Sequence, residues 1–257
     1  MSVPTLAVSP GFRVDGKRAL VTGAGRGLGL AAATALAQAG AAVTLAARSE
    51  GELHAACEAI HAQGGRADYL VLDVTDSKAV AAALASRPAY QVLVNNAGMN
   101  RPKPLTDTPD EDIDQVLTLN VKATFYVTRE VARRMVEAGE KGSIINVSSQ
   151  KGHVGSPRRT LYCASKHAVE GMTKALAWEL GPAGIRVNTV CPTFIETAFT
   201  APMFADPRFR EFVLSRIALG RIGRVEEVMG PIVFLASEAA SLMTGSALML
   251  DGGWTAA

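Results

Sequence analysis

The chain has 257 residues, of which 48% are hydrophobic and 19% charged, and its formal net charge is +2 at pH 7. This length suits one α/β domain, and the scattered basic residues indicate neither a nucleic-acid nor a membrane partner. The three widely spaced cysteines predict no metal site and a reducing compartment. Residues 1–12 lack a signal-peptide pattern and are expected to form a short arm of a cytoplasmic protein. The expected partner is a small molecule.

Short apolar runs alternate with longer segments of helical spacing along the chain. The runs predicted as strands are 19–22, 42–46, 69–72, 92–95, 143–147, 185–190 and 247–250. The segments predicted as helices are 28–39, 53–62, 77–85, 113–137, 162–180 and 225–236. Such alternation predicts one α/β domain over residues 1–257, a doubly wound Rossmann fold with a parallel sheet of about seven strands and helices on both faces. Residues 193–224 follow no clear pattern and are predicted to form a substrate lid.

The first strand leads into T-G-A-G-R-G-L-G, residues 22–29, and then into an alanine-rich helix. Glycines at such a turn let the backbone approach a pyrophosphate, which then lies at the positive end of the helix. The common G-x-G-x-x-G spacing is not met, and an ordinary turn is the alternative, but the position between strand and helix favours a cofactor loop. The predicted contacts are Gly23, Arg26, Gly27, Leu28 and Gly29.

The second strand ends in A-A-R-S, without the acid that binds a free ribose 2′-hydroxyl. A guanidinium matches a 2′-phosphate, so Arg48, helped by Arg26, predicts NADP(H) in preference to NAD(H). The alternative is that Arg48 is a solvated surface charge. Ser49 and Glu52 fit a capping box, so Glu52 is expected to start the next helix and not to bind the ribose.

Two further strand ends carry polar groups that could contact the cofactor. Asp73 and Val74 follow the third strand, where the carboxylate could accept a hydrogen bond from the adenine or could cap a turn. N-N-A-G closes the fourth strand, and its position predicts cofactor contacts from Asn95, Ala97 and Gly98, although the run also suits a plain turn.

Residues 161–166 read L-Y-C-A-S-K and place Tyr162 and Lys166 on one face of a helix. An ammonium group beside a phenol lowers the pKa of the phenol, so the pair could exchange a proton with a carbonyl oxygen near neutral pH. Taken alone, a tyrosine and a lysine at this spacing are far more often a packed ring and a surface charge, so the pair needs support from the rest of the chain.

With T-G-x-x-x-G-x-G, N-N-A-G and Y-x-A-S-K in this order, nearly the whole chain resembles the short-chain dehydrogenase/reductase family. It looks most similar to sugar-acid or polyol dehydrogenases and to 3-oxoacyl-thioester reductases. The resemblance implies hydride transfer between NADP(H) and a carbonyl or secondary alcohol of a small polar substrate, such as a sugar acid or polyol. A 3-oxoacyl-thioester reductase and a catalytically silent NADP-binding regulator are the alternatives.

The resemblance also implies the catalytic residues. Tyr162 would donate the proton, Ser149 would hold the carbonyl oxygen, Lys166 would bind the nicotinamide ribose and lower the pKa of Tyr162, and Asn120 would hold a water. Ser149 is preferred over Ser148 because of its distance from Tyr162. The expected substrate contacts are Ser149, Tyr162 and His153.

Further expectations concern the nicotinamide end, the lid and the assembly. Pro192, Ile195 and Thr197 would hold the carboxamide, and Thr193 in place of the usual glycine predicts some backbone strain. The aromatic and apolar lid residues are Phe199, Met203, Phe204 and Phe212, and the basic rim consists of Arg101, Lys103, Lys151, His153, Arg158 and Arg159. The resemblance implies a homotetramer with interfaces on residues 113–137, on residues 162–180 and in the C-terminal segment.

Overall fold

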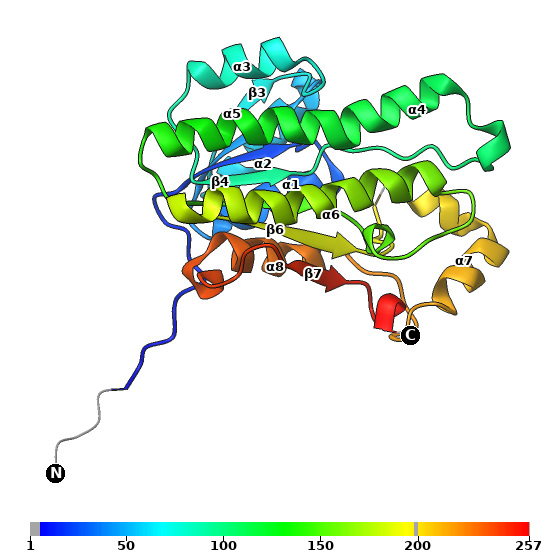
Figure 1. The fold of residues 1–257 in the computed structure, drawn as a ribbon. Coiled ribbons are helices and arrows are strands. Elements are labelled where there is room, and N and C mark those ends of the chain that lie inside the picture. The colour runs from blue at the N-terminus through cyan, green and yellow to red at the C-terminus, as the bar shows by residue number, and fades with distance from the viewer. Residues whose placement is uncertain (1–5, 198–199, 257) are drawn as a thin grey trace.

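One seven-stranded parallel sheet runs through the computed structural model, which describes residues 6–197 and 200–256 (Figure 1). The strands are β1 (Arg18–Thr22), β2 (Ala42–Ala47), β3 (Arg66–Val71), β4 (Val92–Asn95), β5 (Gly142–Val147), β6 (Ile185–Pro192) and β7 (Ala247–Leu250). Their order is β3-β2-β1-β4-β5-β6-β7, with every pairing parallel. The strand order reverses between β1 and β4, so the carboxyl ends of these strands open a crevice there. The predicted doubly wound fold is confirmed.

Helices cover both faces of the sheet, as the alternating pattern predicted. On one face lie α1 (Gly27–Gln38), α2 (Glu50–Ala62) and α8 (Glu226–Ala236), and on the other α3 (Ser77–Ala85), α5 (Ala123–Glu137) and α6 (Thr160–Leu180). In β1, Ala19 and Val21 pack into the first layer and Leu20 into the second, each fully buried. Burial on both sides explains why the strands read as continuous apolar runs.

The long helix predicted for residues 113–137 is instead three consecutive segments. α4 (Asp110–Leu117) is followed by a π-helical turn, Thr118–Lys122, which leads directly into α5. Pro109 precedes α4, where a proline costs no helical hydrogen bond. A π turn carries one more residue than an α turn and shifts the side chains that follow, and this one contains Asn120.

Residues 193–224 contain more regular structure than their sequence predicted. A short 3-10 turn, Ala201–Ala205, precedes α7 (Pro207–Leu214), and Asp206 caps α7 by accepting a hydrogen bond from the Arg208 N–H at 2.9 Å. Phe199, predicted as a lid residue, lies outside the described residues. At the other end, residues 6–12 are exposed coil leading away from the sheet (Figure 1). None of the helices described is long and apolar enough to cross a membrane.

Candidate active site

The turn between β1 and α1 can form only with glycines. Gly23 and Gly27 have positive φ angles of 63° and 58°, which suit glycine and strain other residues. At Gly29 a side chain is excluded by space, because a Cβ would collide with the Gly23 carbonyl oxygen and with Nδ2 of Asn96. The loop therefore keeps the bare backbone that a pyrophosphate needs for close approach.

The amino end of α1 differs from those of the next two helices. α2 is capped by Ser49 and α3 by Asp76, but α1 has neither a side-chain cap nor an acid in its first turn. The first N–H groups of α1 are thus left for an external acceptor, and the helix dipole favours an anion there. The glycine loop and this free helix end together fit the diphosphate of a dinucleotide.

Asn96, which was missed in the sequence, supports the glycine loop. Its Nδ2 donates to the carbonyl oxygens of Thr22 and Gly23 at 3.0 and 3.1 Å, and Thr22 Oγ1 accepts from the Asn96 and Ala97 N–H groups. The side chain of Asn95, predicted to contact the cofactor, instead donates to Thr128 and Asn146 in the core, both at 2.8 Å. Side chains alternate along a strand, so of two adjacent asparagines only one faces the loop.

The residues predicted at the adenosine end lie at the ends of β2 and β3. Arg48 is exposed and makes no ion pair among the residues described, whereas Arg26 Nη1 lies 3.2 Å from Glu52 Oε1. Asp73 accepts from the Thr75 N–H and hydroxyl at 2.9 and 2.7 Å. These hydrogen bonds and the charge of Arg48 lower the pKa of Asp73, although burial opposes them. Asp73 thus holds a turn with one oxygen, and Val74 is buried behind it.

Ser149 and Tyr162 meet where β5 ends and α6 begins. Ser149 Oγ accepts from the Lys151 N–H at 3.1 Å and donates to the Pro192 carbonyl at 3.4 Å. Burial raises the pKa of Tyr162, while a hydrogen bond with Ser149 and the positive charge of Arg159 lower it. Ser148, by contrast, lowers the pKa of the Cys191 thiol, which burial raises. The preference for Ser149 over Ser148 agrees with this arrangement.

Lys166 is 5% exposed, and its ammonium donates to the Val147 carbonyl oxygen at 2.8 Å. Burial lowers its pKa to about 8, against the opposing influence of Cys191 and Glu170. Nζ lies 5.6 Å from the centroid of the Tyr162 ring. The lowering of the Tyr162 pKa by Lys166 stays a prediction.

Asn120 uses its amide to fasten the loop after β4. Its Oδ1 accepts from the Met99 N–H at 2.8 Å, and its Nδ2 donates to the Met99 carbonyl at 2.9 Å and to Ser165 Oγ at 3.0 Å. The π turn places Asn120 against this loop and against α6 together. Gly98 lies on the same loop, and a Cβ there would stand 3.8 Å from Lys166 Nζ. The water-holding role of Asn120 stays a prediction.

The residues predicted at the nicotinamide end close the β6 edge of the site. Pro192 ends β6, and Ile195, 5% exposed, pairs with Gly223. The Ile195 carbonyl accepts from Thr200 Oγ1 at 2.6 Å, and the Thr197 hydroxyl lies 3.1 Å from that of Thr200. The strain predicted at Thr193 is absent, since Arg158, at φ 60°, is the one residue with positive φ besides glycines in the described parts of the chain.

His153 does not turn its Nε2 toward Tyr162. This nitrogen lies 3.4 Å from Glu170 Oε1 and 3.5 Å from Cys191 Sγ, in a largely buried polar cluster behind the serines. Glu170 and Cys191 also lie within 3.2 Å of each other. His153 Nε2 is therefore engaged by Glu170 and Cys191, and the substrate contact of His153 stays a prediction. The spacing of these residues in the sequence did not reveal the cluster.

The predicted lid packs as an aromatic cluster above β6. The Phe194 ring centroid lies 5.6 Å from that of Phe209, 5.8 Å from that of Phe204 and 6.0 Å from that of Trp254. Phe212 reaches the same tryptophan at 6.4 Å. The C-terminal Trp254, not singled out in the sequence, therefore links the lid to the rest of the site.

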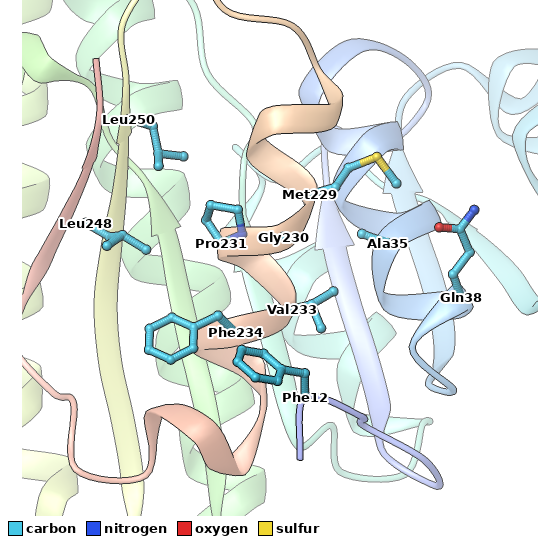
Figure 2. Close-up of a pocket in the computed structure, with 10 residues that line it drawn as sticks. All are labelled: Phe12, Ala35, Gln38, Met229, Gly230, Pro231, Val233, Phe234, Leu248 and Leu250. Atoms are coloured by element: carbon cyan, nitrogen blue, oxygen red, sulfur yellow. The ribbon is translucent and has the colours of Figure 1, made fainter. Parts of the chain in front are cut away.

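An apolar groove of about 590 Å³ lies elsewhere, between α1, α8, β7 and Phe12 (Figure 2). None of its lining residues is titratable, and none is a predicted site residue. Its volume is that of a ligand site, but it offers no group for acid, base or nucleophilic chemistry. The chemistry is therefore assigned to the strand ends around Tyr162.

Comparisons with known proteins agree with this geometry. A family model described as Enoyl-(Acyl carrier protein) reductase matches residues 23–255. Gluconate 5-dehydrogenase of Gluconobacter oxydans is 39% identical over 95% of this chain and 96% of its own, and cyclopentanol dehydrogenase of a Comamonas species is 43% identical over 95% and 99%.

Among solved structures, a gluconate 5-dehydrogenase from Burkholderia cenocepacia, in complex with NADP and tartrate, superposes with a TM-score of 0.92. It is 37% identical and covers 96% of this chain and 98% of its own. Members of this group are oxidoreductases that use NAD(P) and act on alcohol or carbonyl groups. On the strength of fold, site and relatives, the chain belongs to the short-chain dehydrogenase/reductase family.

Proposed function

We propose that this enzyme transfers a hydride between NADP(H) and the carbonyl or secondary alcohol of a small polar substrate such as a sugar acid or polyol. The observation that carries the proposal is the meeting of Ser149, Tyr162 and Lys166 at the end of β5, next to the loop that Asn120 fastens. Relatives that act on gluconate, which is a sugar acid, support the substrate class.

In the proposed mechanism Tyr162 moves the proton. In reduction its hydroxyl donates to the carbonyl oxygen, which Ser149 orients by a hydrogen bond; in oxidation Tyr162 takes the proton back. Ser149 and Arg159 favour the phenolate against the effect of burial. Lys166 contributes a buried ammonium close to the tyrosine ring, and Asn120 a route for proton exchange through water. The nicotinamide, when bound, supplies or accepts the hydride.

The cofactor would be held along the strand ends from β1 to β6. The proposed contacts are Gly23, Arg26, Gly27, Leu28, Gly29, Arg48, Asp73, Val74, Asn95, Ala97, Gly98, Tyr162, Lys166, Pro192, Ile195 and Thr197. Arg48 favours NADP(H) over NAD(H), because its guanidinium is exposed and unpaired within residues 6–197 and 200–256. The B. cenocepacia relative with bound NADP supports this preference. Of these residues, Asn95 already donates its side-chain amide to Thr128 and Asn146.

A second candidate is a 3-oxoacyl-thioester reductase, supported by a 3-oxoacyl-[acyl-carrier-protein] reductase of Thermotoga maritima that is 42% identical over 94% of this chain and 99% of its own. A reductase of that kind binds an acidic carrier protein and needs a basic surface near the site. Arg101 and Lys103 lie on the loop after β4, but both pair with Asp112, at 3.7 and 2.6 Å. This pairing weakens them as a docking surface.

The proposal also covers the domain organisation, the assembly and the location of the protein. The chain acts as a single domain in which residues 193–224 form the substrate lid. It assembles as a homotetramer, supported by apolar side chains that face solvent on α5 and α6, of which Trp178 is 87% and Phe125 49% exposed. It works in the reducing cytoplasm, supported by three buried cysteines that are free thiols.

The test is a hydride-transfer assay over sugar acids, polyols, cyclic alcohols and acyl thioesters with both cofactors. We expect turnover of sugar acids or polyols with NADP(H), and a loss of about 100- to 10,000-fold in Tyr162→Phe, which should still bind NADP through the other proposed contacts. Turnover that survives in Tyr162→Phe would overturn the mechanism. NADP binding without turnover of any substrate would favour the silent regulator, and turnover of thioesters alone the second candidate.

A further inference from the structure

Lys151 is a buried cation without an anionic partner. It is 7% exposed, and within the described parts of the chain its ammonium makes no ion pair or hydrogen bond. Nζ lies 4.4 Å from the centroid of the Trp254 ring. Burial lowers the pKa of Lys151, and the charges of Arg159 and Arg216 lower it further. An isolated charge in such a place costs free energy, so its presence calls for a compensating anion.

Arg159 is a second cation of the same kind. It is half-buried immediately before α6 and, like Lys151, has no ion pair among the residues described. Burial lowers its pKa as well, and its charge acts on Tyr162. The positive φ of Arg158 marks the turn that leads into this position.

The helix that follows adds to the positive potential. α6 has 21 residues, no acid in its first turn and no side chain capping its amino end. The positive end of a helix dipole normally attracts acids, and two arginines are unfavourable there. Lys151, Arg159 and the end of α6 thus bring three sources of positive potential to one place.

The other cations of the predicted rim are different. Arg101 and Lys103 share Asp112, and Arg158 is exposed to solvent. Only for Lys151 and Arg159, within this rim as described, do burial and the lack of an acid coincide. Surface charges need no partner, whereas Lys151 and Arg159 are partly removed from the water that would otherwise stabilise them.

We propose that Lys151 and Arg159 form a subsite for an anionic group of the substrate, a carboxylate or a phosphate. The inference rests on the proposed function, because it places the anion beside the reacting carbon. Lys151 follows Ser149 by two residues and donates its N–H to the Ser149 hydroxyl. Arg159 precedes Tyr162 by three and influences its pKa. The substrate is therefore an acid, with its anionic group between η3 (Gln150–Gly152) and α6, below Trp254.

The experiment measures binding in the absence of turnover. Tyr162→Phe saturated with NADP⁺ is titrated calorimetrically with gluconate, with glucitol, which has an alcohol in place of the carboxylate, and with glucitol 6-phosphate. Gluconate is expected to bind about 10- to 100-fold more tightly than glucitol, since a charge-assisted hydrogen bond between buried groups is lost with the carboxylate. Tight binding of glucitol 6-phosphate alone would identify a phosphate as the anion.

Variants in the same background assign the effect to the two residues. Lys151→Gln and Arg159→Gln are each expected to remove most of the difference between gluconate and glucitol, and Lys151→Arg to keep it. Arg158→Gln is the matched control next in the chain and should leave it unchanged. Lys151→Gln removes an unpaired cation as well as its contact with the Trp254 ring, so the melting temperature should stay about the same, which separates this role from a structural one.

Equal binding of gluconate, glucitol and the phosphate, or no binding of any of them, would overturn the subsite. So would a preference for the anion that persists in both glutamine variants. These outcomes can be told apart from a failure of the proposed function. Turnover of polyols without any preference for an anion would support the proposed function and reject the subsite. Anion binding that depends on Lys151, in a protein that turns over no substrate, would support the subsite and reject the proposed function.

Discussion

The cofactor half and the substrate half of the site are built by different means. From β1 to β4 the site is mostly backbone, shaped by Gly23, Gly27 and Gly29 and fastened by amide groups such as that of Asn96. Around η3 and the start of α6 it is made of charged side chains, and Lys151 and Arg159 are left without partners among the described residues. The first half offers N–H groups to a diphosphate, and the second offers positive charge to a substrate.

The difference shows how each half achieves selectivity. A diphosphate is common to all dinucleotides, so a fixed backbone suffices to bind it. A substrate must be distinguished from similar molecules, and an unpaired buried charge rejects any molecule that fails to neutralise it. Substitutions in the first half should therefore act through shape, and substitutions in the second through charge.

The largest effect is expected for Gly29→Ala. Its Cβ would collide with the Gly23 carbonyl oxygen and lie 2.5 Å from Asn96 Nδ2, so the loop must move. We expect a loss of at least about 3 kcal/mol in the free energy of unfolding and about 100-fold in NADP affinity. Urea unfolding and fluorescence titration would measure both.

Gly51→Ala is the matched control, because Gly51 lies in α2 with nothing within 4 Å of a Cβ. Replacing a helical glycine by alanine should raise stability by about 0.5 to 1 kcal/mol. Equal behaviour of the two alanine variants would show that the loop adapts, and the cofactor half would then not depend on a fixed backbone.

The same contrast explains what the sequence revealed. Gly23, Gly27, Gly29 and the Tyr162 and Lys166 pair were predictable, because a backbone shape or a helical spacing restricts the residue types at those positions. The break in the helix at Asn120 was not, since a π turn leaves no pattern of apolar residues. The cluster of His153, Glu170 and Cys191 was also missed, because its members are far apart in the chain and meet only in the fold.

The charged rim was only partly predictable for a related reason. The sequence showed that Arg101, Lys103, Lys151 and Arg159 were basic, but not which of them had an acid nearby. Asp112 neutralises the first two through contacts across the loop after β4, a matter of tertiary packing. Composition counts charges, whereas the electrostatics of a site depends on which of them are paired and which are buried.

A charge effect on stability is expected at Lys166, at the end of β5. Its pKa of about 8 in the folded protein lies below the ordinary value of 10.5, so between these pH values the unfolded chain binds more protons. Stability should therefore rise with pH across this window, by about 3 kcal/mol in total from this group, and be lowest below about pH 8.

Lys166→Met removes this titration. The free energy of unfolding of the variant minus that of the native chain should be more favourable to the variant at about pH 7 than at about pH 10. The hydrogen bond to Val147 is lost at both pH values and does not affect this change. Urea unfolding of both proteins at the two pH values provides the measurement. A stability difference that is the same at both would mean that Lys166 is not held with a lowered pKa.

A smaller effect is expected for Asn96→Ala. The variant loses two hydrogen bonds to the carbonyl oxygens of Thr22 and Gly23, which costs about 1 to 2 kcal/mol in the free energy of unfolding. NADP affinity should fall about tenfold because the loop is less firmly held. Gln63→Ala, which loses an exposed amide contact to Gln38, is the control and should change stability by no more than about 0.5 kcal/mol. An unchanged NADP affinity in Asn96→Ala would separate this residue from the loop's function.

The smallest effect is expected at Arg48. At this position in the cofactor half, charge should matter more than shape. Arg48→Ala should raise KM for NADP by about tenfold and leave KM for NAD unchanged, because only the 2′-phosphate needs the guanidinium. Stability should change by no more than about 0.5 kcal/mol, since the side chain is exposed. Arg26→Ala is the comparison: Arg26 already has Glu52 at 3.2 Å, so its loss should affect NADP less. If the native enzyme preferred NAD, or if both variants kept the same preference, Arg48 would be a solvated charge, and the cofactor half would discriminate by backbone alone.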